Sequence, residues 1–118
     1  GEQTVRGNRD RTRLHQLDGK TAIAPGITVH PGGGHTRRGQ WVFVDGSPDV
    51  LLASDFAYLY DNLERGVPAG NAPDPIAAKN TLTDILRMNV LPRFVLPGHD
   101  PRVSRRFDTV SRHIHRIR

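Results

Sequence analysis

Three short apolar runs in this chain each end in a side chain that can bind a metal ion. The first run leads into a glycine-rich loop that presents His35, the second ends at Asp55, and the third is followed by Pro-Gly and then His99. Short apolar runs bounded by turn residues are typical of β-strands. Imidazole and carboxylate groups together suit zinc, iron or manganese. This repeated pattern is the strongest indication of chemistry in the sequence.

The composition limits what else the chain can be. Its 118 residues allow one domain, and an apolar content of 36% together with 12 glycines is normal for a folded domain. The absence of cysteine excludes disulfides and thiolate metal ligands. No apolar run approaches the roughly 20 residues that span a bilayer, and no signal peptide is visible. We therefore expect no membrane partner, and a cytoplasmic location is compatible with the sequence.

The net charge of +5 is concentrated at the two ends of the chain. Four arginines lie in residues 1–13, and six arginines with two histidines lie in residues 102–118. A basic end can contact nucleic acid or an acidic partner, but charge runs at chain ends are more often simply solvated. Among the C-terminal arginines the one aromatic residue is Phe107, so a base-stacking surface is not indicated. A nucleic acid is therefore not the favoured partner.

The first half of the chain has the pattern of short strands joined by tight turns. Strands are predicted over residues 21–24, 27–30, 40–44 and 50–53. The third of these is rich in β-branched and aromatic residues, which favour strands. Asp45-Gly46 between the third and fourth strands is a hairpin turn signal.

The second half changes to helical periodicity. Four further elements are predicted: a helix over 56–65, a helix over 75–89, a strand over 91–96 that contains Pro92, and a final helix over 103–117. Asp74 as N-cap and Pro75 as first helical residue are typical of a helix start. The final helix is predicted from apolar residues spaced three to four apart.

Strands followed by helices imply an α+β or a layered α/β arrangement. Two helices and a tail cover only one face of the predicted sheet, so the chain has the pattern of half of a larger layered structure. Residues 1–20 form a polar entry segment, residues 21–112 form this half domain, and residues 113–118 form a basic tail.

Three motifs that follow the apolar runs point to a known family. They are Gly34-His35-Thr36, the run from Asp55 to Tyr58, and Pro97-Gly98-His99-Asp100-Pro101. In this order they resemble the C-terminal half of the metallo-β-lactamase superfamily, and they look most like the N-acyl homoserine lactonase group. The resemblance covers roughly residues 17–101. It implies an αββα sandwich, of which only the C-terminal αβ half is present here.

The resemblance also implies a role for each matching residue. His35 would bind the first of two metals, Asp55 would bridge both, and His99 would bind the second. Zinc is the default metal, with iron or manganese as alternatives. The implied activity is hydrolysis of a lactone or ester by a metal-bridging hydroxide, with Tyr58 over the substrate carbonyl. Asp100 would orient one of the ligands.

The sequence departs from the family pattern in two places. Arg37 and Arg38 stand where the family usually has Pro-Gly, and they either bind an anionic part of the substrate or form a solvated loop. The family's His-x-His-x-Asp-His motif, which supplies most of the metal ligands, is absent. We therefore expect a second polypeptide or an N-terminal half to complete the site, and we do not expect this chain alone to be active.

Other interpretations of the same residues stay open at this stage. Asp55 is also a good helix N-cap, and His35 and His99 also fit ordinary loop positions. Tyr60 competes with Tyr58 for the catalytic role. As alternative functions, the chain is a non-catalytic basic binding module or an RNA-processing member of the same fold.

Overall fold

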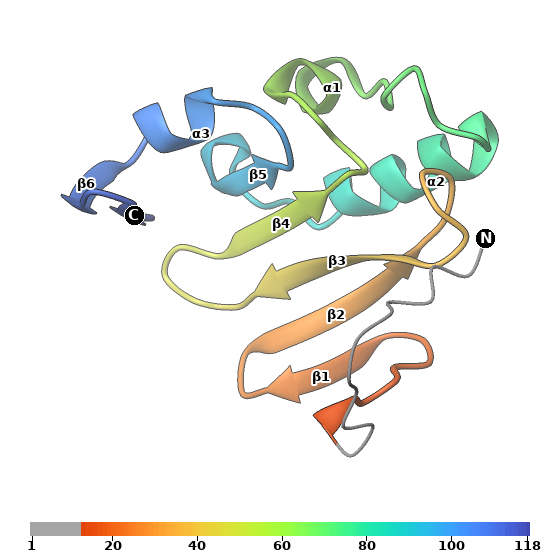
Figure 1. The fold of residues 1–118 in the computed structure, drawn as a ribbon, viewed down its shortest axis with the longest axis horizontal. Coiled ribbons are helices and arrows are strands. Elements are labelled where there is room, and N and C mark those ends of the chain that lie inside the picture. Colours follow the sequence, from red (N-terminus) through yellow and green to blue (C-terminus); the bar gives the residue numbers. More distant parts are fainter. Residues whose placement is uncertain (1–12) are drawn as a thin grey trace.

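A computed structural model describes residues 13–118 and contains one main sheet (Figure 1). Its strands follow in sequence order: β1 (Thr21–Ala24), β2 (Ile27–Gly32), β3 (Gly39–Val44), β4 (Val50–Ser54) and β5 (Val95–Pro97). Strands β1 to β4 are antiparallel neighbours, and β5 pairs with β4 in parallel. The four strands predicted in the first half are confirmed. Most of the predicted polar entry segment, residues 1–12, lies outside the described residues.

Helix α2 (Pro75–Leu86) begins as predicted. The side chain of Asp74 accepts a hydrogen bond from the Ala77 amide at 3.0 Å, and Pro75 occupies the first turn. Among the described helices, none is long and apolar enough to cross a membrane.

Helix α1 (Tyr60–Arg65) is shorter than predicted at its N-terminal end. The carbonyl groups of Ala57 and Tyr58 accept hydrogen bonds from Gly98 and His99, at 2.8 and 3.0 Å. They are therefore occupied by the loop after β5 and are not used to begin a helix at Phe56.

Two predictions for the C-terminal third are wrong. The strand over 91–96 is reduced to β5, because Pro92–Phe94 forms a 3₁₀ turn and Pro92 has no amide proton to donate to a ladder. The helix over 103–117 is absent: α3 (Arg102–Arg105) is one turn, and a hairpin of β6 (Asp108–Ser111) and β7 (Ile114–Arg116) follows.

The hairpin exposes the residues that the predicted helix would have buried. Phe107 packs with Phe94 and Leu96, but Val110 and Ile114 are 54% and 58% exposed. An apolar helical face here would have no surface among the described residues to pack against. Val110 and Ile114 are β-branched and therefore favour a strand.

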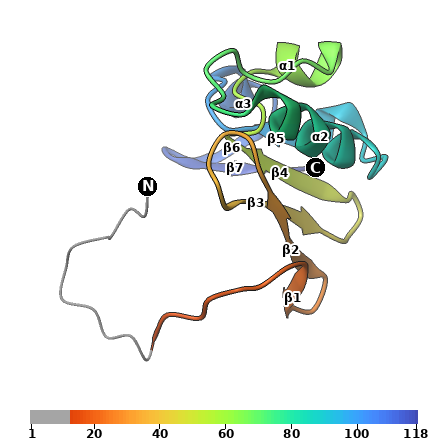
Figure 2. The same ribbon diagram turned by 90° about the vertical axis from the view of Figure 1, so that its right-hand side faces the viewer.

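The sheet has two unlike faces. On one face, Trp41, Leu51 and Ala53 pack against Leu82 and Ile85 of α2 and form the main core. Figures 1 and 2 show α1 and α2 beside the β4–β5 end of the sheet, with β1 at the opposite end. On the other face, Leu52 is 40% exposed, and the residues around Phe107 cover its β4–β5 end. This second face is apolar and partly open.

The glycine-rich loop after β2 is packed directly on α2. Gly34 has φ +111°, and a Cβ atom there would lie 2.2 Å from the backbone nitrogen of Ala78. The Thr81 hydroxyl bonds both the carbonyl and the amide of Gly33, at 2.9 and 3.1 Å. This contact fixes the backbone that leads into His35.

We predict that Gly34→Ala lowers the free energy of unfolding of the chain by about 2 kcal/mol or more, because the new methyl group overlaps the α2 backbone and the φ angle is unfavourable. Urea unfolding followed by Trp41 fluorescence measures the change. Gly70→Ala is the matched control, since no atom lies within 4 Å of a Cβ there, and it should change stability by less than about 1 kcal/mol. Equal midpoints for the two variants would contradict the packing described.

Candidate metal centre

The strand directions bring the three predicted ligands to one edge of the sheet. Strand β3 runs antiparallel to both β2 and β4, and β5 runs parallel to β4. The C-terminal ends of β2, β4 and β5 therefore lie at the same edge. His35 follows the first of these ends, Asp55 the second and His99 the third.

At this edge the Asp55 carboxylate lies between two imidazole rings. Its Oδ1 is 2.8 Å from His99 Nε2, and its Oδ2 is 3.2 Å from His35 Nε2. The side chain of His35 is 23% exposed, and its Nδ1 is buried without a hydrogen-bond partner. Each imidazole thus contacts a different oxygen of one carboxylate.

Local backbone geometry places Asp55 and His99 this close. Ser54, the last residue of β4, has φ +53°, which turns the chain sharply before Asp55. Gly98 packs against this turn, and a Cβ atom there would lie 2.7 Å from the Ser54 carbonyl oxygen. Only glycine allows the two loops to approach this closely.

Tyr58 lies beside the two histidines, and Tyr60 does not. The Tyr58 ring is edge-on to His99 and His35, with centroid distances of 4.6 and 5.6 Å. Tyr60 is 2% exposed, its ring is covered by the guanidinium of Arg106 at 3.6 Å, and burial raises its pKa. Of the two tyrosines, Tyr58 is the one placed to act at this edge.

Asp100 has a different contact from the one expected for it. Its buried carboxylate accepts hydrogen bonds from the Tyr60 amide at 3.0 Å and from the Arg102 guanidinium at 2.8 Å. The hydrogen bond from Arg102 holds the pKa of Asp100 well below its usual range. Asp100 therefore joins the His99 loop to the start of α1 and to α3.

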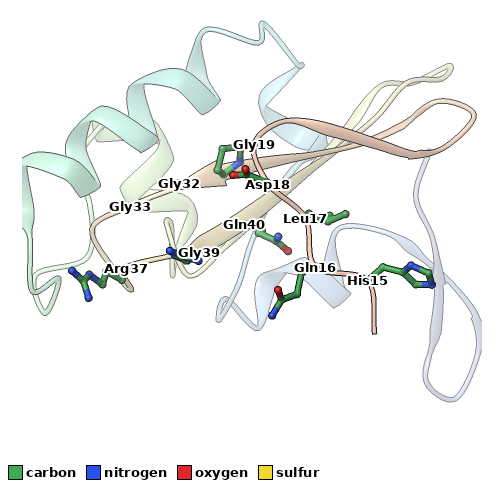
Figure 3. A pocket seen from close by; sticks show the side chains of 12 residues that line it. His15, Gln16, Leu17, Asp18, Gly19, Gly32, Gly33, Arg37, Gly39 and Gln40 are labelled. Atoms are coloured by element: carbon green, nitrogen blue, oxygen red, sulfur yellow. The ribbon is translucent and has the colours of Figure 1, made fainter. Parts of the chain in front are cut away.

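Arg37 and Arg38 are exposed and line an open cleft of about 990 Å³ (Figure 3). The segment 15–19 forms one wall of the cleft, and the ends of β2 and β3 form the other. Pro31 and Gln40 line the cleft from the partly open face of the sheet.

Asn71 was missed by the sequence reasoning. Its side-chain amide donates a hydrogen bond to the Tyr58 hydroxyl at 3.2 Å. The sequence around it is a Gly/Pro/Asn-rich connector, and nothing in that pattern distinguishes a residue that contacts the site from one that forms a turn.

The donor set fits part of a two-metal site. Two ligand atoms bound to one zinc ion at about 2.1 Å each lie roughly 3–3.5 Å apart. The separations of 2.8 and 3.2 Å between Asp55 and the two imidazoles are close to this range. However, each metal would receive only two protein ligands, whereas catalytic zinc uses three. Within residues 13–118, no group of three or more His, Asp or Glu side chains is arranged to hold one ion.

Comparison with known proteins identifies the fold. No family model matches the sequence, and no curated protein matches it significantly. Solved structures do match, and several of them are N-acyl homoserine lactonases, which belong to the metallo-β-lactamase superfamily. The chain has the lactonase fold. This confirms the predicted fold class.

Three of these lactonase structures illustrate the match. A mutant of B. thuringiensis AiiA with N-decanoyl-L-homoserine bound at the active site has a TM-score of 0.65 and 23% identity over 75% of this chain. A quorum-quenching lactonase has a TM-score of 0.63 and 24% identity over 72%. A lactone hydrolase with N-hexanoyl-L-homoserine bound at the catalytic metal centre has a TM-score of 0.65 and 23% identity over 75%. The chain spans 36% of the length of each.

We predict that Asp100→Asn lowers the free energy of unfolding by about 2 kcal/mol at pH 7, because it removes a buried charge-assisted hydrogen bond. The pKa of Asp100 is lower in the folded state than in the unfolded state. The ionised carboxylate therefore stabilises the fold above about pH 4, and this stabilisation is lost as the pH falls further. Urea unfolding at pH 7 and pH 3 should therefore show a smaller difference between variant and wild type at pH 3. Asp108→Asn, at a side chain 76% exposed, should change stability by less than about 0.5 kcal/mol at pH 7. A difference for Asp100→Asn that does not shrink at pH 3 would contradict this role.

Proposed function

We propose that this chain is the C-terminal portion of a metal-dependent hydrolase that cleaves a lactone or an ester. The observation that carries the proposal is the Asp55 carboxylate held between His35 Nε2 and His99 Nε2. Three loops from distant parts of the sequence converge to make this contact. The lactonase fold supports the same reaction class. One solved neighbour has N-decanoyl-L-homoserine bound at its active site, and another has the product N-hexanoyl-L-homoserine bound at its catalytic metal centre.

In this proposal each side chain has a distinct task. Asp55, His35 and His99 would hold the metal ions, with the Asp55 carboxylate shared between the two imidazoles. Bound metals, zinc by preference or iron or manganese, would supply an acidified water and would polarise the substrate carbonyl. Tyr58 donates a hydrogen bond to the carbonyl oxygen as negative charge develops there. Arg37 and Arg38 bind an anionic part of the substrate.

A second polypeptide, or an N-terminal half, would complete the proposed site. Two features support this partner. The described residues offer no group of three ligands for one metal ion, and one face of the sheet is apolar and partly open beside the cleft of Figure 3. Burying Leu52 and its neighbours would also stabilise the assembly, by about 25 cal/mol for each Å² of apolar surface removed from water. A cytoplasmic location stays a prediction from sequence.

The alternative function is a basic binding module, which includes an RNA-processing role. The C-terminal hairpin favours it, because Arg112, Arg116 and Arg118 are exposed there. The meeting of His35, Asp55 and His99 at one edge of the sheet is a more specific indication of function than an exposed basic surface. The hydrolase is therefore the preferred function.

The first test is the metal content and intact mass of the native material purified from its source. We expect two metal ions per complex and a companion polypeptide beside this chain of 13.1 kDa. Elemental analysis and native mass spectrometry measure both quantities. A single 13.1 kDa species without metal would exclude the catalytic function of this chain, and steep salt dependence of RNA affinity would then support the alternative.

A second test uses Asp55→Asn in the same complex. Removal of the shared carboxylate charge should release metal and lower hydrolysis of an N-acyl homoserine lactone by about 100-fold or more. Asp45→Asn, in the exposed turn between β3 and β4, is the matched control and should keep both metal and activity. Full metal occupancy in Asp55→Asn would contradict the bridging role.

A further inference from the structure

We propose that Asn71 is a positioning residue that directs the proton of the Tyr58 hydroxyl toward the substrate. The inference rests on the proposed hydrolase function, because it assigns a task within the same site. It concerns the connector between α1 and α2, for which the sequence pattern predicts no role in the site.

The hydrogen bond between the two side chains sets the direction of the proton. Asn71 Nδ2 donates to Tyr58 Oη at 3.2 Å. A phenol oxygen that accepts a hydrogen bond from an amide keeps its own proton available for another acceptor. The Tyr58 O–H group is thus not used in its hydrogen bond with Asn71 and can donate to another acceptor.

An acceptor can reach this hydroxyl from an adjacent groove. The groove has a volume of about 430 Å³ and is lined by Tyr58, His99, Asn71 and Leu59, among others. Since Tyr58 is edge-on to both imidazoles, a carbonyl group that enters the groove beside His99 lies next to the phenol. Its oxygen is then the acceptor for the Tyr58 proton.

Hydrogen bonds from other residues hold the connector in shape. The Asn62 side chain donates to the Val67 carbonyl at 3.0 Å, and the Lys79 ammonium donates to the Gly66 carbonyl. The Ala72 amide also donates to the Ala69 carbonyl at 3.3 Å. These contacts remain when Asn71 is replaced, so a loss of activity can be attributed to Tyr58.

The decisive substitution is Asn71→Asp, which keeps the size of the side chain and reverses its hydrogen bond. A carboxylate only accepts, so it draws the Tyr58 proton away from the substrate. If instead the Asn71 side-chain oxygen accepted from Tyr58 in the wild type, the same substitution would leave the bond and the activity unchanged. The variant therefore distinguishes the two polarities.

The contact itself is tested without any activity, by nuclear magnetic resonance of the ¹⁵N-labelled chain. Tyr58→Phe should move the side-chain amide proton of Asn71 upfield, because its acceptor is lost. The side-chain amide of Asn80, exposed on α2, should not move. An unchanged Asn71 resonance would overturn the proposal whether or not the protein is an enzyme.

The task of Asn71 is tested by kinetics of the metal-loaded complex with an N-acyl homoserine lactone as the probe. Asn71→Asp should lower kcat about 10-fold with little change in KM, and Asn80→Ala should change neither. In the Tyr58→Phe background, Asn71→Asp should have no further effect, since both act through one proton. Full activity of Asn71→Asp, or an equal loss in both backgrounds, would overturn the positioning role.

One combination of results separates this inference from the function on which it rests. If the Asn71 resonance shifts in Tyr58→Phe but the complex hydrolyses neither lactone nor ester, the proposed function fails. The positioning role of Asn71 then fails with it, and the hydrogen bond is a structural contact only.

Discussion

The backbone of residues 57–58 is joined to the loop after β5 by two hydrogen bonds, and the arrangement of the site depends on this contact. The bonds from Gly98 and His99 bring the end of β5 against the end of β4. Through them, His99 reaches Asp55 and Tyr58 comes to lie beside His99. The contact also delays the start of α1 to Tyr60, because carbonyl groups that serve the neighbouring loop are not available to a helix.

Close packing of glycine fixes two of the loops that carry the site. Gly98 lies against the Ser54 carbonyl, and Gly34 lies against the first turn of α2. Each position leaves no room for a Cβ atom, so the loops approach one another at backbone distance. The buried Asp100 carboxylate also links the same loop to α1 through the Tyr60 amide and to α3 through the Arg102 guanidinium. The positions of His35 and His99 are thus set by backbone contacts, while their side chains remain accessible.

The incomplete ligand set and the partly open sheet face have a common origin in the proposal. The chain spans 36% of the length of a lactonase with the same fold. In the proposal, the missing partner would both cover the open part of the sheet and supply the remaining metal ligands. In the C-terminal segment, residues predicted to pack as one face of a helix form an exposed hairpin instead.

The sequence by itself determined the strands of the first half, the start of α2 at Asp74, and the identity and order of His35, Asp55 and His99. These features depend on local patterns: apolar runs, turn residues and an N-cap. Only the tertiary structure decided that Tyr58 and not Tyr60 lies at the site, that Asp100 binds Arg102, and that Asn71 reaches the Tyr58 hydroxyl. It also decided that residues after Phe107 form strands. The physical reason is that these outcomes depend on hydrogen bonds and packing between segments far apart in the chain, which periodicity and local propensity do not encode.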